Sequence, residues 1–293
     1  SYRKLAMRVL GRPLHTGGND SPRPASQRAA AFILTAAMLT TLAAPAFADT
    51  WCIENGNITV KAGDTEGTNK VSQGSIIDRE DTNTIITNSD KDTASSNTVT
   101  IDAGNDKVEV TLDNVNIKAG SGSALTSKGD VTLTLKGDNH LTGGISDTGN
   151  YGRNGIASTG SLTISGGSTV TANGGNGGNV SGDGISSNGS VTISGGTVKA
   201  AGGDSKDGYG GDGIRSGGGV TISGNTVNAA GGNGGKVGGY GICSFDRVAI
   251  SGGTVTANGG DGSSGGDGIR SGDIDLSGSL ELTAKAGSPN GKA

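Results

Sequence analysis

The chain has few of the residues that most often carry chemistry: two histidines, two cysteines and one tryptophan among 293 residues. His15 lies near the N-terminus and His140 stands alone, so histidine-based catalysis and a zinc site both lack support. Cys52 and Cys243 could form a disulfide only if their Cα atoms came within about 6 Å of each other. We expect two free thiols, with Cys243 on the outward side of its strand.

Aromatic residues make up only 3% of the chain. Outside the N-terminal region, the rings that could stack on a neutral sugar are Trp51, Tyr151, Tyr209 and Tyr240, and their positions suggest no continuous stripe. The sequence therefore favours a charged glycan over a cellulose-like or chitin-like ligand.

The charge balance excludes other partners. The chain has 23 Lys and Arg against 27 Asp and Glu. Residues 1–48 hold six of the basic residues and one of the acidic ones, which leaves 17 against 26 and a net charge of −9. Such a charge disfavours nucleic acid and anionic lipid as partners, and it favours cations or anions bridged by cations.

Residues 1–48 have the pattern of a basic leader and a secretory signal peptide. A nearly continuous apolar stretch, 29–48, follows the basic region and ends in the sequence A-F-A. A membrane anchor is the alternative, but Pro45 and the many alanines and threonines favour cleavage. We expect a mature chain that begins at Asp49, inserts no segment into a membrane, and is secreted or held on the surface of a bacterium.

Glycine is abundant, with 58 residues, and it punctuates a sequence that repeats. The repeated unit is marked by Ile156, Ile185, Ile214, Ile242 and Ile269, at steps of 29, 29, 28 and 27 residues. A fixed period of this size is typical of a solenoid, in which each repeat buries its apolar face against its neighbours.

Each repeat contains three short stretches in which apolar and polar residues alternate, which is the pattern of strands with one buried face. Like strands recur about 29 residues apart, so they should pair in parallel between successive coils, about 4.8 Å apart. Connections of this kind are nearly always right-handed. The sequence predicts an all-β fold, a right-handed three-sided parallel β-helix with about 28–29 residues per coil.

The repeat also predicts which side chains face inward. The inward rows beside the isoleucines are Leu162, Val191, Val220 and Val248; Ile164, Ile193, Ile222 and Ile250; and Val170, Val198, Val227 and Val255. A row of serines follows the isoleucines by two places, at Ser158, Ser187, Ser216, Ser244 and Ser271. We expect these hydroxyls to face inward and to bond one another or the backbone, as buried hydroxyls must.

Four regions follow from these patterns. Residues 1–48 are the leader and signal peptide, 49–96 an N-terminal cap with a first irregular coil, 97–287 the β-helix, and 288–293 a tail. Leu125 precedes Ile156 by 31 residues and should share its register. We expect a C-terminal portion to be missing, which could be a further domain or a cell-surface anchor.

Two rows of acidic and amide residues could hold a cation. The first is Asn154, Asp183, Asp212 and Asp267, interrupted by Tyr240, and the second is Asn176, Asp204, Asn233 and Asp261. Asp and Asn beside glycine are common turn formers, and that role alone explains both rows. The alternative is calcium, which takes six to eight oxygen ligands. Its candidate ligands are Asp183, Asp212, Asp267, Asn154, Asp204 and Asp261.

Units such as GGDGIRSGG and VTISGGTVKA behind a signal peptide give the chain a family likeness. From Asn97 to Gly287 it resembles the secreted bacterial β-helix proteins called carbohydrate-binding domain-containing. The resemblance implies a pectate-lyase-like fold and calcium-dependent binding of acidic plant polysaccharide. The D-G-I aspartates of the family correspond to Asp183, Asp212 and Asp267, while the first row departs from the motif at its other two positions.

Three functions stay open at this point. The first is non-catalytic binding of an acidic, polygalacturonate-like polysaccharide through Arg215, Arg270, Lys199 and Tyr240, with calcium as cofactor. The second is a structural stalk or adhesin. The third is a polyuronate lyase, which would need a calcium–carboxylate cluster and a base. No segment between strands is long enough to build the loops that cover a lyase cleft, so we expect no enzyme.

Overall fold

The computed structural model describes residues 49–292, so the predicted signal peptide lies outside the described residues. Strands and turns make up nearly all of this part of the chain, together with one short 3₁₀ helix, η1 (Ile53–Asn55). Within residues 49–292, no helix is long and apolar enough to cross a membrane.

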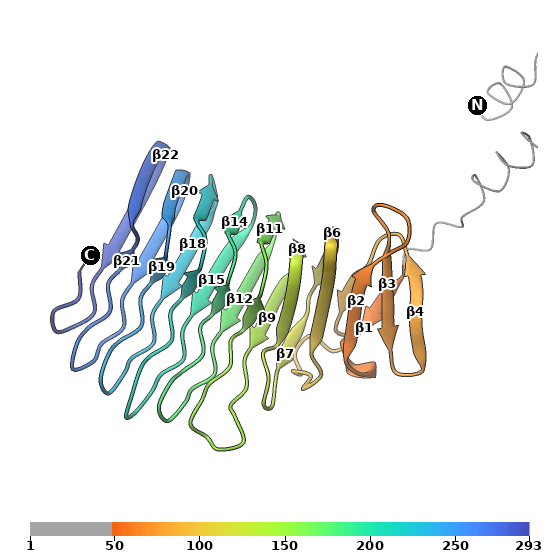
Figure 1. Ribbon diagram of the computed structural model, residues 1–293, viewed down its shortest axis with the longest axis horizontal. Helices are drawn as coiled ribbons and strands as arrows, with labels where there is room; N and C mark the ends of the chain where they lie inside the picture. The colour runs from red at the N-terminus through yellow and green to blue at the C-terminus, as the bar shows by residue number, and fades with distance from the viewer. Residues whose placement is uncertain (1–48, 293) are drawn as a thin grey trace, which may run out of the picture. The chain divides into compact units, whose positions relative to one another are not determined.

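Parallel strands stack into a solenoid of about seven turns, each with three sides (Figure 1). The strands of the regular coils are β10 (Ile156–Ser158), β11 (Leu162–Gly166), β12 (Thr169–Asn173), β13 (Ile185–Ser187), β14 (Val191–Ile193), β15 (Thr197–Ala201), β16 (Ile214–Ser216), β17 (Val220–Ser223), β18 (Thr226–Ala230), β19 (Ile242–Ser244), β20 (Arg247–Asn258), β21 (Ile269–Arg270) and β22 (Asp273–Lys285). Strands β20 and β22 run around a corner and serve two sides each. The predicted three-sided parallel β-helix is confirmed.

Register follows the repeat. On the first side Ile156 pairs with Ile185, and the pairing continues through Ile214 and Ile242 to Ile269. Toward the N-terminus, β8 (Leu125–Lys136) pairs in parallel with β10 and β11, and with β6 (Val99–Asp113). Leu125 therefore shares the register of the first side, as predicted.

The first part of the described chain pairs differently. Its other strands are β1 (Thr50–Cys52), β2 (Ile58–Ala62), β3 (Asn69–Gln73), β4 (Ile76–Asp81), β5 (Ile85–Thr87), β7 (Asn116–Lys118) and β9 (Asp138–Thr142). Strands β2, β3 and β4 form an antiparallel meander, whereas β1, β2 and β5 lie parallel to solenoid strands or to each other. Apolar side chains of this segment, such as Trp51 and Val71, join the core.

The predicted inward rows form that core. Each member of the four apolar rows is buried, and most have no exposed surface. The serine row is buried from Ser158 to Ser244, and its hydroxyls bond backbone carbonyls rather than one another. Ser216, for example, lies 2.8 Å from the carbonyl oxygen of Gly189 in the preceding coil.

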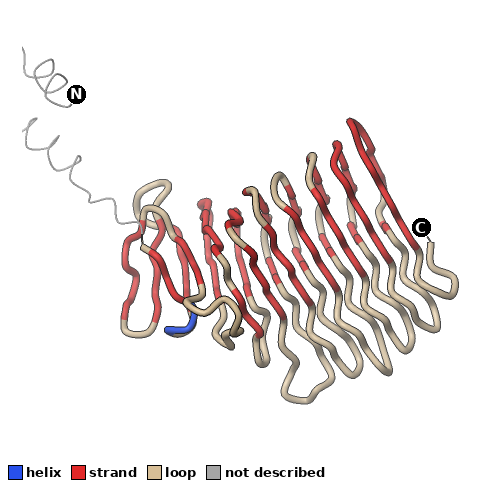
Figure 2. The backbone as a smooth tube through the Cα atoms, turned by 180° about the vertical axis from the view of Figure 1, so that it is seen from behind, coloured by secondary structure: helices blue, strands red, loops and turns tan. Residues whose placement is uncertain are grey.

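The longest loops leave the third side of each coil and return to the first side of the next (Figure 2). These corner loops, 143–155, 174–184, 202–213, 231–241 and 259–268, stack on one another along the solenoid. Residues 288–292, expected as a tail, continue this stack, because the N–H groups of Ser288 and Lys292 bond side chains of the preceding corner loop.

Glycines hold the two arms of each corner loop together. The amide of Gly182 donates to the carbonyl of Gly175 in the same loop, and the amide of Gly203 in the next loop donates to Gly182. The same zigzag continues through Gly211, Gly232, Gly239, Gly260 and Gly266. The corner loops therefore form one continuous hydrogen-bonded layer and are not independent of one another.

Candidate functional site

Most of the predicted site residues gather on the first side of the solenoid, near the corner loops. Arg215, Cys243 and Arg270 occupy one outward row in consecutive coils. We call the arginine cluster the group made of Asp183, Asp212, Arg215, Tyr240, Cys243, Phe245 and Arg270. Lys199 does not join it, because β15 places Lys199 on the third side.

Each arginine of the cluster lies over an aromatic ring. The Cζ atom of Arg215 is 5.4 Å from the centroid of Phe245, and that of Arg270 is 5.0 Å from the centroid of Tyr240. Arg270 also donates a hydrogen bond to the Tyr240 hydroxyl. A guanidinium this close to a ring face is attracted by the ring quadrupole, so both cations are held in place.

The two arginines differ in their ion pairs. Nη1 of Arg215 lies 3.4 Å from Oδ2 of Asp212. Arg270 forms no direct ion pair among the described residues, although its charge lowers the pKa of Asp212. The side chain of Phe245 is 66% exposed, so nothing in the described chain covers this end of the cluster.

The first acidic row acts as a ladder of turn-type hydrogen bonds. Oδ1 of Asn154 accepts the backbone N–H of Asp183 at 2.8 Å, and Oδ1 of Asp183 accepts that of Asp212 at 2.8 Å. Oδ1 of Asp212 accepts the N–H of Tyr240 at 2.7 Å, and Oδ1 of Asp267 accepts the N–H of Lys292 at 2.9 Å. The row thus ties successive coils together, as turn-forming side chains can.

Burial sets the protonation of the two central carboxyls. Asp212 is 4% exposed, and loss of water around it, together with the charge of Asp183, raises its pKa to about 7. Desolvation also raises the pKa of Asp183. Two neighbouring carboxyls whose charges repel cannot both ionise easily, so the pair gives up its two protons over a wide pH range.

Cys243 is buried between the arginines, with 4% of its surface exposed, although it was expected on the outward side of its strand. Cys243 occupies an outward position of its strand, in line with Arg215 and Arg270, but the neighbouring side chains of the cluster cover it. Desolvation and the charge of Asp212 raise the pKa of its thiol to about 11. Cys52 and Cys243 are both free, as predicted.

The second acidic row forms a similar ladder within the corner loops. Oδ1 of Asn176 accepts the N–H of Asp204, Oδ1 of Asp204 accepts that of Asn233, and Oδ1 of Asn233 accepts that of Asp261. These bonds are 2.7–2.9 Å long. Asp204 and Asp261 therefore lie apart from the arginine cluster and have a structural role of their own.

The carboxylates as they lie do not fit a calcium ion. One oxygen of each row member accepts a backbone N–H, and the other oxygen of Asp212 faces Arg215. Among residues 49–292 no three His, Cys, Asp or Glu side chains converge on a point where a metal could bind. Calcium needs six to eight oxygens, and these rows offer carboxylates one at a time along the solenoid. Calcium binding stays a prediction without geometric support.

Lys199 lines a separate shallow hollow of about 200 Å³ on the third side. Its floor is made of alanines such as Ala201 and Ala230, and its polar rim includes Asn173 and Asn258. Oδ1 of Asn258 is buried and has no hydrogen-bond partner. Another hollow, of about 810 Å³, lies near the N-terminal end between 62–69 and 105–109, and it contains none of the predicted site residues.

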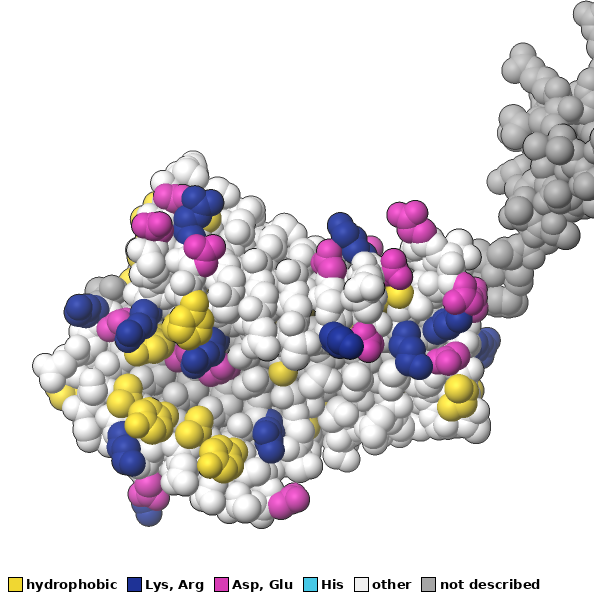
Figure 3. All heavy atoms as spheres, in the orientation of Figure 1, with side chains coloured by type: hydrophobic (Ala, Val, Ile, Leu, Met, Phe, Trp, Pro, Cys, Tyr) yellow, Lys and Arg dark blue, Asp and Glu magenta, His cyan; other side chains and the backbone are white. Residues whose placement is uncertain are grey.

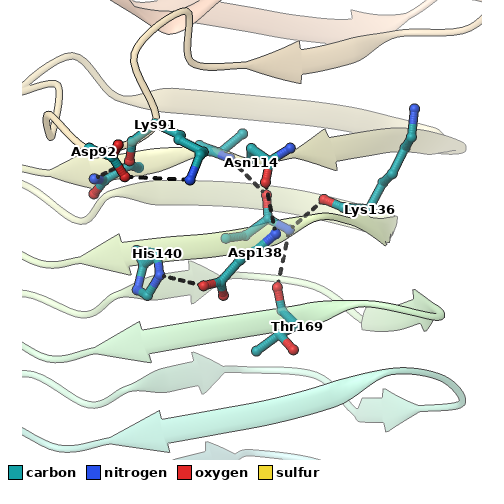
Figure 4. A network of polar contacts seen from close by, with 10 residues as sticks. Lys91, Asp92, Asn114, Lys136, Asp138, His140 and Thr169 are labelled. Carbon is teal, nitrogen blue, oxygen red and sulfur yellow. Dashed lines mark hydrogen bonds and ion pairs between the residues drawn. The ribbon is translucent and has the colours of Figure 1, made fainter.

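His140, the single histidine of the described chain, is a surface residue of β9. Its Nε2 atom lies 3.1 Å from Oδ2 of Asp138, and Figure 4 shows the ring turned toward that carboxylate. The residue between them, Asn139, is fully buried and bonds Val115 and Thr169. His140 therefore makes a solvent-exposed polar contact with a neighbour on its own strand.

Two of the aromatic residues, Tyr151 and Tyr209, belong to a row that runs along the corner loops. Tyr151, Val180, Tyr209, Val237 and Ser264 pair in parallel, one residue from each successive corner loop. We call the first four of these residues the corner stripe. The four candidate rings were expected to form no stripe, and Tyr151 and Tyr209 are separated in this row by Val180. The mixed row of tyrosine and valine was not expected. Trp51 is buried at 3% exposure and Tyr240 belongs to the arginine cluster, so neither joins it.

One face of the molecule carries two groups of hydrophobic and charged side chains. Figure 3 shows hydrophobic side chains in a row over the corner loops, with Lys and Arg side chains beside the row. A second group on the same face combines hydrophobic, basic and acidic side chains.

No protein-family profile, curated protein or solved structure matches this chain.

Proposed function

We propose that the protein is a secreted or cell-surface binding protein that holds an acidic polysaccharide without cleaving it. The arginine cluster is the site of carboxylate binding in this proposal. The observation that carries it is Arg270, an exposed guanidinium that lies over Tyr240 and forms no direct ion pair with a carboxylate in the described chain.

The chemistry of the cluster suits a carboxylate. A guanidinium presents parallel N–H donors that match the two oxygens of a carboxylate, and the pair is stronger than a neutral hydrogen bond. Arg215 and Arg270 are two coils apart, or roughly 10 Å at the usual strand spacing. One carboxylate cannot reach both, so a polymer that carries a carboxylate at regular intervals fits better than a small acid.

Arg215 gains a role as the pH falls. Its partner Asp212 has a pKa of about 7, so below that pH the carboxyl becomes neutral and the guanidinium is released to a ligand. The family resemblance points the same way, since it implies acidic plant polysaccharide. Calcium is not needed in this scheme, because the carboxylates of the ligand meet arginines directly.

Catalysis is not part of the proposal. A lyase needs a free base beside the sugar and a means of neutralising the uronate carboxylate. The cluster has cations for the second task, but Asp183 and Asp212 are committed to backbone amides and Cys243 is a buried thiol with a raised pKa. Release of unsaturated products from polygalacturonate, seen as ultraviolet absorbance, would refute this part of the proposal.

The test is binding of polygalacturonate to the mature chain by calorimetry, with and without EDTA. Arg215→Gln/Arg270→Gln should weaken binding at least tenfold, because each lost charge-assisted bond contributes about 1.5–3 kcal/mol and tenfold corresponds to about 1.4 kcal/mol. The matched control is Arg247→Gln, since Arg247 is exposed and already paired with Asp275 at 2.7 Å.

Three outcomes would count against the proposal. Unchanged affinity in the double variant would remove the arginine cluster as the site. No binding by the wild type, with or without calcium, would leave the structural stalk. Loss of binding in EDTA alone would restore the calcium-bridged alternative.

A further inference from the structure

Three of the four residues of the corner stripe are exposed apolar side chains, and the fourth, Val237, is half-buried. Tyr151 and Tyr209 are 51% and 50% exposed, and Val180 is 40% exposed. Their backbones pair from loop to loop, so the four residues lie in line along the solenoid. An ordered row of exposed apolar side chains is a common mark of an interaction surface.

Glycines keep the stripe uncovered. Two glycines follow two of the stripe residues: Gly210 and Gly211 after Tyr209, and Gly238 and Gly239 after Val237. Tyr151 and Val180 are each followed by one glycine and one residue with a side chain. A Cβ on any of these glycines would overlap a carbonyl oxygen of an adjacent loop, so no side chain can grow there. Tyr209 and Val237 therefore stand beside a glycine surface that precedes Asp212 and Tyr240 of the arginine cluster, whereas exposed Arg153 occupies the corresponding place beside Tyr151.

The other flank of the stripe is polar. The residues that precede it are Asn150, Asn179, Gly208 and Lys236. Their side chains, where present, are exposed. Lys236, and Lys206 in the preceding loop, form no ion pair within residues 49–292. Amide groups and free cations beside an apolar row offer hydrogen bonds to hydroxyls and charge to carboxylates.

We propose that the corner stripe is a track on which the sugar rings of a polysaccharide stack, with the chain parallel to the solenoid axis and one sugar over each coil. Rings and methyl groups attract the C–H face of a pyranose, because ring faces are electron-rich and both surfaces are apolar. The acidic character of the ligand rests on the proposed function, whereas the stacking does not depend on it.

The spacing of the stripe selects this occupant. Successive members are about 4.8 Å apart, close to the length of one pyranose in an extended 1,4-linked chain. Tyr alternates with Val, so the large rings recur at every second coil. In a two-fold extended polysaccharide every second sugar presents the same face, so its period matches that of the rings. The unpaired cations on the flank favour a chain of uronates over a neutral chain.

The first measurement is the dependence of affinity on ligand length, with oligogalacturonates of increasing size. The stripe spans four coils. Affinity should rise steeply up to four sugars and level off beyond that, because a longer chain has no further ring to meet. Equal affinity for a disaccharide and a hexasaccharide would overturn the track.

The second measurement removes the rings. Tyr151→Ala/Tyr209→Ala should weaken binding of the tetrasaccharide at least tenfold, and Tyr151→Phe/Tyr209→Phe should bind within twofold of wild type. The phenylalanine pair separates stacking from hydroxyl hydrogen bonding. Circular dichroism melts check that both variants fold, and Thr221→Ala, at an exposed outward position of β17, is the control. Wild-type affinity in the alanine pair would overturn the inference.

Comparison with the arginine variants separates this inference from the proposed function. Loss in Arg215→Gln/Arg270→Gln but not in the alanine pair would sustain the arginine cluster and overturn the stripe. Binding of a neutral 1,4-linked oligosaccharide that disappears in the alanine pair would sustain the stripe and count against the acidic ligand. No binding of any chain, or a change in self-association alone on removal of the rings, would overturn the stripe as a sugar track.

Discussion

At the scale of single residues, Asp212 is under two opposing influences. Burial and the neighbouring Asp183 favour its neutral form, while the Tyr240 amide and Arg215 favour its charge. The first influences are larger, and the folded-state pKa is raised from 3.8 to about 7. A carboxyl that binds its proton more tightly in the folded than in the unfolded chain makes stability fall as pH rises.

This sign gives a prediction for Asp212→Asn. Between about pH 4 and 7 the folded wild type holds a proton that the unfolded chain releases, so its unfolding free energy declines across that window and is constant above it. The neutral variant lacks this decline and keeps the Oδ1 acceptor for the Tyr240 N–H, as Asn154 does for Asp183. A rise of about three pKa units sets an upper limit of about 4 kcal/mol on the gain at pH 8.

The measurement is denaturant unfolding of wild type and variant at pH 5 and pH 8. Asp267→Asn, in the same row, controls for replacing a carboxylate by an amide at this kind of position. A variant that is less stable than wild type at pH 8 would show that ionised Asp212 stabilises the fold through Arg215. In that case the raised pKa, and release of Arg215 at low pH, would both be wrong.

The sequence showed part of the site at this scale. The acidic rows were visible because Asp and Asn recur beside glycine, and their role as turn formers could be predicted from that alone. The burial of Asp212 and Cys243 could not, since it depends on side chains from three coils. The sequence signal for the arginine cluster was the break in the repeat at Tyr240, which stands where other coils have Asp or Asn. Tyr240 and nearby Phe245 place rings against Arg270 and Arg215.

At the scale of elements, the corner loops depend on glycine for close approach rather than for an unusual backbone. The left-handed glycines of the regular coils, such as Gly196 and Gly224, lie at the turn between the second and third sides. In the corner loops, Gly203 and Gly211 bond each other across the loop. The sequence indicated that glycines punctuate the repeat, but not which corner needs a left-handed backbone and which needs close approach.

Gly211→Ala tests this layer. A methyl group at Gly211 would overlap the carbonyl oxygen of Gly182, and backbone atoms cannot move aside as a flexible side chain could. We expect a loss of about 3 kcal/mol or more, at the upper end of the cost of overpacking. Gly120→Ala is the matched control, because a Cβ there would meet no atom within 4 Å. Equal melting temperatures for the two variants would show that the loops are not a tightly packed layer.

The corner stripe was missed at this scale although its signal was present. Tyr151, Val180, Tyr209 and Val237 are separated by 29, 29 and 28 residues, the same steps that separate the isoleucines. A search for aromatic residues alone finds two positions and no row, because valine fills the alternate places. Aligning every repeat position by the solenoid period, whatever the residue type, would have found the row.

At the scale of the whole molecule, the period was enough to predict the solenoid because parallel stacking uses the same residues in every coil. The N-terminal region has no such period, and its antiparallel meander β2–β3–β4 could only be described as an irregular cap. Where repeats end, register is set by particular contacts, such as the bond from Trp51 to Asp81 at 2.8 Å. Those contacts leave no periodic trace in a sequence.

The last prediction concerns removal of a coil. Deleting 214–241 joins Gly213 to Ile242 and keeps the D-G-I junction, so Ile185 can pair with Ile242 as it does with Ile214. Because each coil contacts only its neighbours, the shortened chain should fold with a melting temperature within a few degrees of wild type. Deleting 214–227 instead removes half a coil, puts unlike strands side by side and should abolish cooperative melting.

The full-coil deletion also removes Val237, which leaves three members of the stripe, so the preferred oligosaccharide should shorten by one sugar. If the full-coil deletion unfolds as readily as the half-coil deletion, the coils are not interchangeable units. The rows of side chains along the solenoid, and a track with one sugar per coil, would then both be wrong.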